Sequence, residues 1–426
     1  MKRLYRNARI AREDSPRLEE ADVLIEGDRI TGVAPAMRGV KDCVEIDCAG
    51  AVLLPALFDL HVHAREPGQE EKENIASCAE AAINGGITGF VMMPDTAPAV
   101  DGAGTLRSVL ESAHRSRLGQ GILAAGAITK GRMGQELAGI AGMKAAGCVL
   151  LSDGGPPVDN PQVLRRAMEY AREFDLPVAS HGEVRELSGK GCMHEGRVSY
   201  ALGLPGIPSI SEEIGIARDI RLAEFTGVHL HVQQVSTVKG LATIRRAKER
   251  GIRVTCEVSP HHLIFHHESV GDYDTNFKVN PPLRTPEDNA ALIEGLREGW
   301  IDAVASGHAP HTPFEKNQDF ASAPFGITGL ETALVSLHHH FIAAGTLDWG
   351  VLVRRCSAEP RRLLGLPPVP VQEGGIAEFV VFQPQRQTVC SRDFLQSRSS
   401  NTPFLDRSLT GCVERVISRG VELIAR

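Results

Sequence analysis

The stretch Phe58-Asp59-Leu60-His61-Val62-His63-Ala64-Arg65-Glu66-Pro67-Gly68 carries the strongest fold signal in the chain. An apolar run over residues 51–60 leads into it and predicts a buried strand. His61 and His63 stand two residues apart at the strand exit, so both rings leave the same side of the chain. Hydrogen-bonded surface histidines would explain a bare His-x-His pair. The adjacent Arg65 favours instead a divalent metal site that receives an anionic substrate.

Outward from this stretch, apolar segments alternate with amphipathic helical ones. Eight strands are predicted, at residues 51–60, 87–94, 121–129, 148–153, 176–181, 228–236, 252–260 and 302–309. Helices are predicted between them, for example at 72–84, 135–146, 162–174, 212–225, 237–249 and 286–297. This alternation predicts the α/β class and a (β/α)8 TIM-type barrel. A doubly wound open sheet is the alternative, but no Gly-x-Gly-x-x-Gly follows a predicted strand.

The two ends of the chain differ from the middle. Short β-like pieces with tight turns fill residues 1–50, and β character returns after about residue 365. We expect three segments: 1–50 and 366–426 together form a small β-sandwich, and 51–365 form the barrel, a fold used by metal-dependent hydrolases.

Net charge and cysteine content indicate which classes of partner are excluded and in which compartment the protein is expected. A net charge of −7 without a basic tract argues against nucleic acid or an anionic membrane. No signal peptide or membrane-spanning run is visible. The nine cysteines are dispersed, without a Cys-x-x-Cys pair, which fits reduced thiols in a cytoplasmic protein.

Barrel active sites lie where the strands end, and four candidate ligands fall there. The first strand delivers His61 and His63, the fourth delivers Asp153, and the fifth delivers His181. A single buried histidine at a strand end is usually a core residue. Four donors at strand exits of one barrel instead predict a metal centre with hydrolytic chemistry.

Longer motifs resemble one family. His61 to Gly68 is similar to the signature of bacterial class I dihydroorotases, members of the amidohydrolase superfamily. Further similar motifs follow in the same order, at Met92-Met93-Pro94-Asp95-Thr96, Leu202–Pro208, Pro260-His261-His262-Leu263, Asn280-Pro281-Pro282-Leu283-Arg284, His308-Ala309-Pro310-His311 and Pro324–Thr332. The resemblance spans nearly the whole chain.

The resemblance implies the interconversion of carbamoyl-aspartate and dihydroorotate, a cyclic amide, in pyrimidine synthesis. It implies a binuclear zinc centre in which His61 and His63 hold one ion, Asp153 bridges and His181 holds the second. It also implies substrate binding by Arg65, Asp95, Asn280, His311, Phe325 and Gly326. Allantoinases and hydantoinases share the barrel but commonly use a carbamylated lysine as the bridge.

Three positions depart from the family pattern. Gln234 stands where the sixth strand should supply a zinc histidine, and Gly307 replaces the aspartate that binds zinc and shuttles the proton. Asp95 replaces a substrate-binding asparagine. A carboxamide binds zinc less well than imidazole, and glycine supplies neither ligand nor base. Loss of a general acid/base typically costs about 10²–10⁴ in rate. Asp95 adds negative charge beside the site for an anionic substrate.

Nearby residues offer limited compensation. His231 precedes Gln234 by three residues and His308 follows Gly307 by one, and such odd offsets on a strand point to the opposite face. Glu183, two residues after His181, is a weaker candidate for a substitute acid or base. One zinc ion is therefore expected rather than two, with an empty site as a further alternative.

Two hypotheses of different class follow. One is an inactive or weakly active dihydroorotase homologue that assembles with aspartate transcarbamoylase as a scaffold. The other is an active, mononuclear dihydroorotase, with another cyclic amide or ureide as a third alternative. If the protein is active, its expected substrate is a small molecule, dihydroorotate or carbamoyl-aspartate. The resemblance also implies a homo-oligomer. His338-His339-His340 lies in a helical stretch and is interpreted as helix surface or packing.

Overall fold

The apolar run before His61 forms two strands, not one. In the computed structural model, which describes residues 2–425, β5 (Val52–Pro55) is followed by β6 (Leu57–Val62). Between them, the Ala56 amide donates to the Glu378 carbonyl and the Ala56 carbonyl accepts from the Ser357 hydroxyl. The strand predicted over 51–60 is therefore divided, because Ala56 bonds to the C-terminal part of the chain and not to barrel neighbours.

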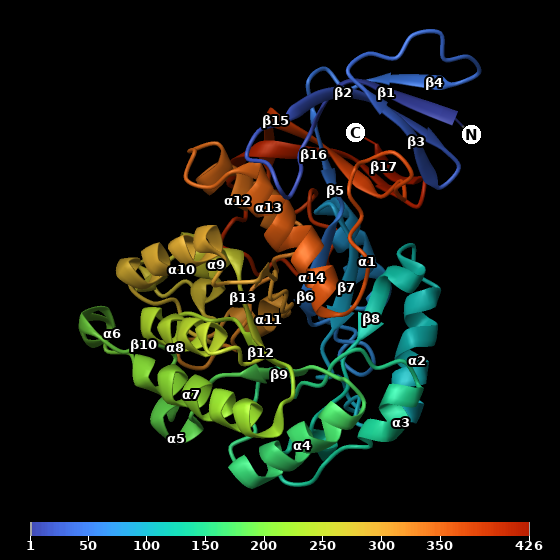
Figure 1. Ribbon diagram of the computed structural model, residues 1–426. Coiled ribbons are helices and arrows are strands. Elements are labelled where there is room, and N and C mark those ends of the chain that lie inside the picture. Colours follow the sequence, from blue (N-terminus) through green and yellow to red (C-terminus); the bar gives the residue numbers. More distant parts are fainter. Residues whose placement is uncertain (1, 426) are drawn as a thin grey trace.

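Both ends of the chain contribute to one eight-stranded sheet beside the barrel (Figure 1). Its order is β17-β16-β15-β5-β1-β2-β3, with β4 paired to β1. The bounds of the strands other than β5 are β1 Lys2–Ile10, β2 Glu19–Glu26, β3 Arg29–Ala34, β4 Val44–Asp47, β15 Phe379–Val389, β16 Ser408–Ser418 and β17 Val421–Ala425. The rings of Tyr5 and Phe379 pack edge to face at 5.2 Å between centroids and join the two ends in one core.

The barrel has eight parallel positions, as predicted. One group of strands is β6, β7 (Ile87–Met92) and β8 (Ile122–Ala124); the other is β9 (Val178–His181), β12 (Leu230–Gln233), β13 (Val254–Val258) and β14 (Ala303–Val304). Leu151 bridges β9 to the end of β8, and Val62 bridges to His308, which closes the ring. The fourth predicted strand is reduced to Leu151 because the chain turns away at Gly154, where φ is 60°.

Helices cover the outside of the barrel (Figure 1). The longer ones are α1 Ile75–Asn84, α2 Ala103–His114, α4 Pro161–Glu173, α7 Ser209–Thr226, α8 Val238–Glu249 and α10 Pro286–Glu298. The shorter ones are α3 Ile140–Ala145, α5 Arg185–Ser188, α6 Arg197–Leu202, α9 Pro260–Ile264, α11 Pro313–Lys316, α12 Ala333–Leu337, α13 Trp349–Val353 and α14 Glu359–Leu363. Two short strands, β10 (Met193–His194) and β11 (Gly206–Ile207), pair outside the barrel. No helix within residues 2–425 is long and apolar enough to cross a bilayer.

The histidine tract serves packing, as predicted. His338 is buried, and its Nδ1 lies 2.8 Å from the Thr410 carbonyl of β16. The Thr410 amide donates to Nδ1 of His339. The tract therefore fastens the end of α12 to the C-terminal sheet.

Candidate functional site

The two histidines of the opening stretch are held by buried carboxylates. Nδ1 of His61 lies 2.7 Å from Oε1 of Glu257, a hydrogen bond that leaves Nε2 free. Nδ1 of His63 lies 2.8 Å from Oδ2 of Asp95, a close approach without hydrogen-bond geometry. The rings are 5.2 Å apart between centroids. Burial lowers the pKa of His63 to about 4, whereas Glu257 outweighs burial and raises the pKa of His61.

A second cluster surrounds Arg65, which follows the histidines in a left-handed conformation with φ of 63°. Its Nη1 donates to Oδ2 of Asp95 at 2.7 Å, and its Nη2 lies 3.4 Å from Nε2 of His311. Burial alone would raise the pKa of Asp95, but His63 and Arg65 hold it well below its usual range. The guanidinium predicted to meet a substrate anion is thus already paired with a carboxylate of the chain.

His311 joins the predicted substrate-binding loop to this cluster. Its Nε2 lies 3.0 Å from the Phe325 carbonyl, and its Nδ1 lies 3.3 Å from Oε2 of Glu315. Gly326 has φ of 146°, and a Cβ there would stand 3.0 Å from the His311 ring, so glycine allows the close approach. The structure therefore brings together Arg65, Asp95, His311, Phe325 and Gly326.

Asp153 is held in place by the segment that follows β8. Its Oδ1 accepts from the amides of Ile128 at 2.9 Å and Thr129 at 3.0 Å, and its Oδ2 accepts from the Thr129 hydroxyl at 2.6 Å. Burial raises the pKa of this carboxyl above its ordinary value. These three bonds fix the side chain; Oδ1 accepts two of them, and Oδ2 accepts one and keeps a lone pair.

His181 ends β9 and contacts the candidate substitute acid. Its Nε2 lies 3.3 Å from Oε2 of Glu183, which also accepts from Nδ2 of Asn280 at 3.0 Å. Burial raises the pKa of Glu183, but His181 outweighs burial and the pKa falls to about 2. Asn280, predicted to bind substrate, therefore lies with His181 and Glu183.

Gln234 and Gly307, the two positions where a lost zinc ligand and a lost base are expected from the resemblance, meet in space. Gln234 follows β12 in a left-handed conformation with φ of 49°, and Gly307 follows β14 with φ of 60°. A Cβ built on Gly307 would lie 2.2 Å from Nε2 of Gln234 and 3.5 Å from Cε1 of His261. The carboxamide of Gln234 thus fills the volume that a side chain at position 307 would need.

Neither His231 nor His308 takes the place of the ligand or base that Gln234 and Gly307 are expected to lack. His231 lies 3.1 Å from Oε2 of Glu257, so it shares that carboxylate with His61. His308 is completely buried and accepts from the Gly329 amide at Nδ1, while its Nε2 lies 3.5 Å from Glu73. Both rings therefore have partners of their own.

Three residues of the site were not singled out from the sequence. Glu257 orients His61, Thr129 fixes Asp153, and His261 lies beside Gly307. Glu257 could have been identified from the sequence, because a carboxylate inside an otherwise apolar predicted strand needs a buried partner. Thr129 could not, since its role arises only when two strands lie side by side.

The donor set does not compose a complete metal centre. Across residues 2–425, no group of three or more His, Cys, Asp or Glu side chains is arranged to hold a metal ion. Asp153 has one lone pair of Oδ2 left beside its three hydrogen bonds, and Gly307 offers no donor. A tetrahedral zinc site needs three or four protein ligands. His61 and His63 alone do not meet that requirement.

The fold, a barrel with an attached β-sandwich, is shared with solved structures of hydantoinases and dihydropyrimidinases. L-hydantoinase from Arthrobacter aurescens superposes with a TM-score of 0.87 at 23% identity, covering 99% of this chain and 96% of that one. Dihydropyrimidinase from Brevibacillus agri superposes with a TM-score of 0.84 at 22% identity, over 100% and 95%. At these identities the likeness concerns the fold.

Sequence similarity gives the family. A family model described as dihydro-orotase-like matches residues 50–240. Dihydroorotase of Carboxydothermus hydrogenoformans is 40% identical over 98% of this chain and 97% of its own length. That of Syntrophotalea carbinolica is 42% identical over 96% of each. The chain belongs to the dihydroorotase family, which confirms the resemblance inferred from the motifs.

Proposed function

We propose that this chain is a dihydroorotase-family protein that is weakly active or inactive and supports aspartate transcarbamoylase as a structural partner. In this proposal its barrel rim, the site at the ends of the barrel strands, is degenerate, because it lacks a zinc ligand and the catalytic base. The observation that carries the proposal is the Gln234 carboxamide, which fills the space beside Gly307. The family resemblance assigns that space to the aspartate that binds zinc and shuttles the proton. With a carboxamide there, the rim has no base at the position that the reaction uses.

The Arg65–Asp95 pair supports the same proposal. The resemblance assigns Arg65 to the substrate carboxylate, but Asp95 already holds its Nη1 at 2.7 Å. An incoming anion would have to compete with a buried, ionised carboxylate. Weak substrate binding follows from this competition.

An active, mononuclear enzyme is the second candidate function. The hydrogen bond from His61 to Glu257 favours it, because metal-ligating histidines usually donate their other ring nitrogen to a carboxylate. In that case His61 and His63 would hold one zinc ion with help from Asp153, His181 or Gln234. A different cyclic amide or ureide as substrate is the third alternative.

We further propose a cytoplasmic homo-oligomer that contacts neither nucleic acid nor membrane. The cysteines Cys43, Cys48, Cys78, Cys148, Cys192, Cys256, Cys356, Cys390 and Cys412 are all free thiols, which suits a reducing compartment. The proposed division of the chain follows the segments 1–50, 51–365 and 366–426, with residues 52–55 assigned to the sandwich because β5 pairs there.

The test combines metal content, turnover and partner capture. The purified protein is expected to hold at most one zinc per chain and to hydrolyse dihydroorotate far below the usual enzyme range of about 1–10³ s⁻¹. Gly307→Asp combined with Gln234→His should raise zinc occupancy towards two. Turnover in the ordinary range would reject the degenerate rim, and failure to co-purify with the transcarbamoylase would reject the scaffold separately.

A further inference from the structure

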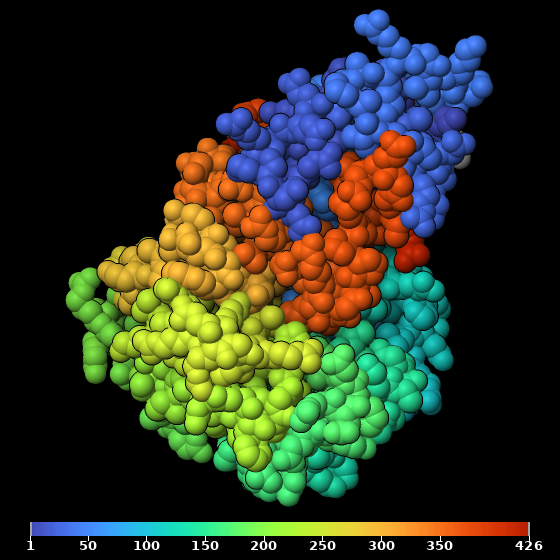
Figure 2. All heavy atoms as spheres, in the orientation of Figure 1, coloured from blue at the N-terminus to red at the C-terminus, as the bar shows by residue number. Residues whose placement is uncertain are grey.

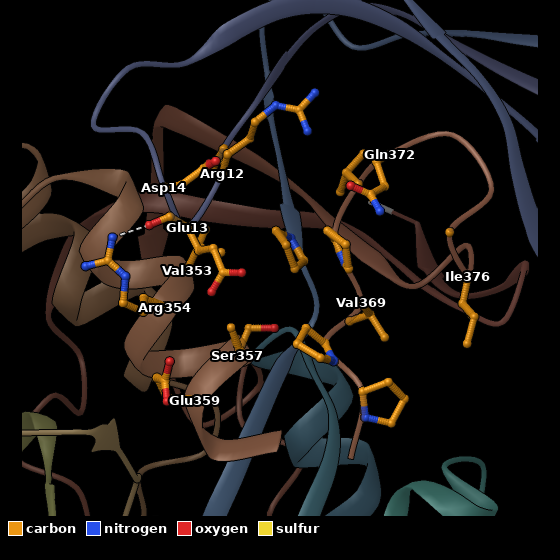
Figure 3. Close-up of a pocket in the computed structure, with 18 of the residues that line it drawn as sticks. Arg12, Glu13, Asp14, Val353, Arg354, Ser357, Glu359, Val369, Gln372 and Ile376 are labelled. Atoms are coloured by element: carbon orange, nitrogen blue, oxygen red, sulfur yellow. Dashed lines mark hydrogen bonds between the residues drawn. The ribbon is translucent and has the colours of Figure 1, made fainter. Parts of the chain in front are cut away.

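A large cavity lies where the sandwich meets the barrel. Its volume is about 910 Å³, within the size range of small-molecule sites, which often lie between domains. The surface is visibly hollowed where the blue N-terminal part meets the orange segment (Figure 2). Arg12, Glu13 and Asp14 line one side, the helical segment with Arg354 another, and the segment of residues 367–376 a third (Figure 3).

The floor of this interdomain cavity is apolar and preorganised. Four prolines line it, together with valine side chains at positions 353, 369 and 371: Pro55, Pro367, Pro368 and Pro370. Proline rings fix the backbone φ, so this surface loses little entropy when a ligand covers it. Rigid, apolar pyrrolidine rings can pack against a planar aromatic group through van der Waals contact.

The rim of the cavity carries cationic groups without acidic partners. Arg29 donates only to the Gly374 carbonyl, at 3.3 Å, and Arg354 donates to the Glu13 carbonyl. Neither arginine has an ion pair within residues 2–425, whereas Arg12 pairs with Glu19, and Arg362 pairs with Glu13 and Glu359. Two arginines without an ion pair, Arg29 and Arg354, therefore line the cavity together with one carboxylate, Asp14, for which no ion pair is found in the described residues.

We propose that the interdomain cavity binds a small anionic aromatic molecule of the nucleoside monophosphate class. The base would lie on the proline floor, and the phosphate would be met by Arg29 and Arg354, since guanidinium groups bind phosphate through paired N–H donors. The proposal does not depend on whether the barrel rim is active.

The cavity is remote from the barrel rim. Pro55 lines it at the entrance of the first barrel strand, and His61 stands at the other end of that strand. Six residues of extended chain span roughly 20 Å. A ligand here would touch both the sandwich and the barrel without reaching the histidines.

Isothermal titration calorimetry with AMP and UMP on the full-length protein tests the proposal. We expect saturable binding with a Kd below about 1 mM, and affinity about tenfold weaker in Arg29→Gln and in Arg354→Gln. Arg386→Gln, which changes an exposed arginine of β15 outside the cavity, should bind like the unmodified protein. Adenosine, uridine and inorganic phosphate should each bind more than tenfold more weakly than the monophosphates.

Several results would overturn it. They are the absence of saturable binding by both nucleotides, unchanged affinity in Arg29→Gln, or inorganic phosphate that binds as tightly as AMP. Arg29→Gln is the decisive variant because Arg29 is exposed and its loss removes only one hydrogen bond to a backbone carbonyl. Carbamoyl-aspartate should leave the affinity for AMP unchanged, and competition between them would place the nucleotide at the barrel rim instead.

Discussion

Gln234 and Gly307 share one small volume at the barrel rim, so the two residues are coupled. Nε2 of Gln234 would lie 2.2 Å from a Cβ at position 307, and the positive φ of Gly307 disfavours any side chain there. Gly307→Ala should destabilise the protein by about 1–3 kcal/mol. In a Gln234→Ala background the cost should fall by about 1 kcal/mol, because only the backbone strain remains. Urea unfolding of the four proteins measures the coupling, and additive effects would contradict it.

Asp95 forms an ion pair with Arg65 and so competes with a substrate anion for its guanidinium. Asp95→Asn removes the charge that pairs with Arg65, so carbamoyl-aspartate should bind about tenfold more tightly. The variant should also lose about 1–3 kcal/mol of stability, because a buried guanidinium loses its counter-charge. Calorimetric titration and urea unfolding give the two values. Unchanged affinity would mean that the Arg65 guanidinium does not meet the ligand.

Glu331 links three elements at the end of the barrel. It lies just before α12 and accepts from Nδ2 of Asn84 at the end of α1 and from the Gln396 amide of the C-terminal segment. Burial is the main cause that raises its pKa from 4.5 to about 7. Because the folded-state pKa lies above the unfolded value, its contribution to stability is complete below about pH 4.5 and is lost as the pH rises through 7.

Glu331→Gln should therefore stabilise the protein at pH 8, by up to about 3 kcal/mol, and have little effect near pH 4.5. The amide keeps an acceptor oxygen for Asn84 and the Gln396 amide. Urea unfolding of variant and unmodified protein across this pH range checks the result. Glu298→Gln, at an exposed position of α10, serves as the matched control and should show no such pH dependence. A constant difference between variant and unmodified protein at all pH values would contradict the interpretation.

For the whole molecule, the sandwich and the barrel should unfold together. β5 belongs to the sheet and runs into β6 of the barrel through one residue, Ala56. A buried ion pair of 2.7 Å joins Arg361 of α14 to Glu378 next to β15. Thermal unfolding followed by far-UV and near-UV circular dichroism should give one shared midpoint.

Arg361→Ala tests this connection. It leaves the Glu378 carboxylate buried without its partner and should cost about 3–5 kcal/mol, with a lower midpoint for both signals. Arg386→Ala, at an exposed position of the same sheet, should leave the midpoint unchanged. Separate transitions for the two signals in the unmodified protein would show that the parts are independent.

The sequence by itself determined the barrel and the sheet from both chain ends. Strand and helix periodicities are local properties, and the motifs around His61 keep their order along the chain. The identities of the residues at 95, 234 and 307 also indicate, without any coordinates, where the chain is expected to depart from the family pattern.

Only the tertiary structure decided which residues these departures contact. Gln234 and Gly307 lie 73 positions apart in the sequence, and nothing local indicates that one fills the space of the other. The pairing of Arg65 with Asp95, and of His61 with Glu257, likewise depends on strands brought side by side. The same holds for the division of the first strand at Ala56 and for the interdomain cavity. Side-chain volume and charge act over a few ångströms in space, and the fold alone sets those distances.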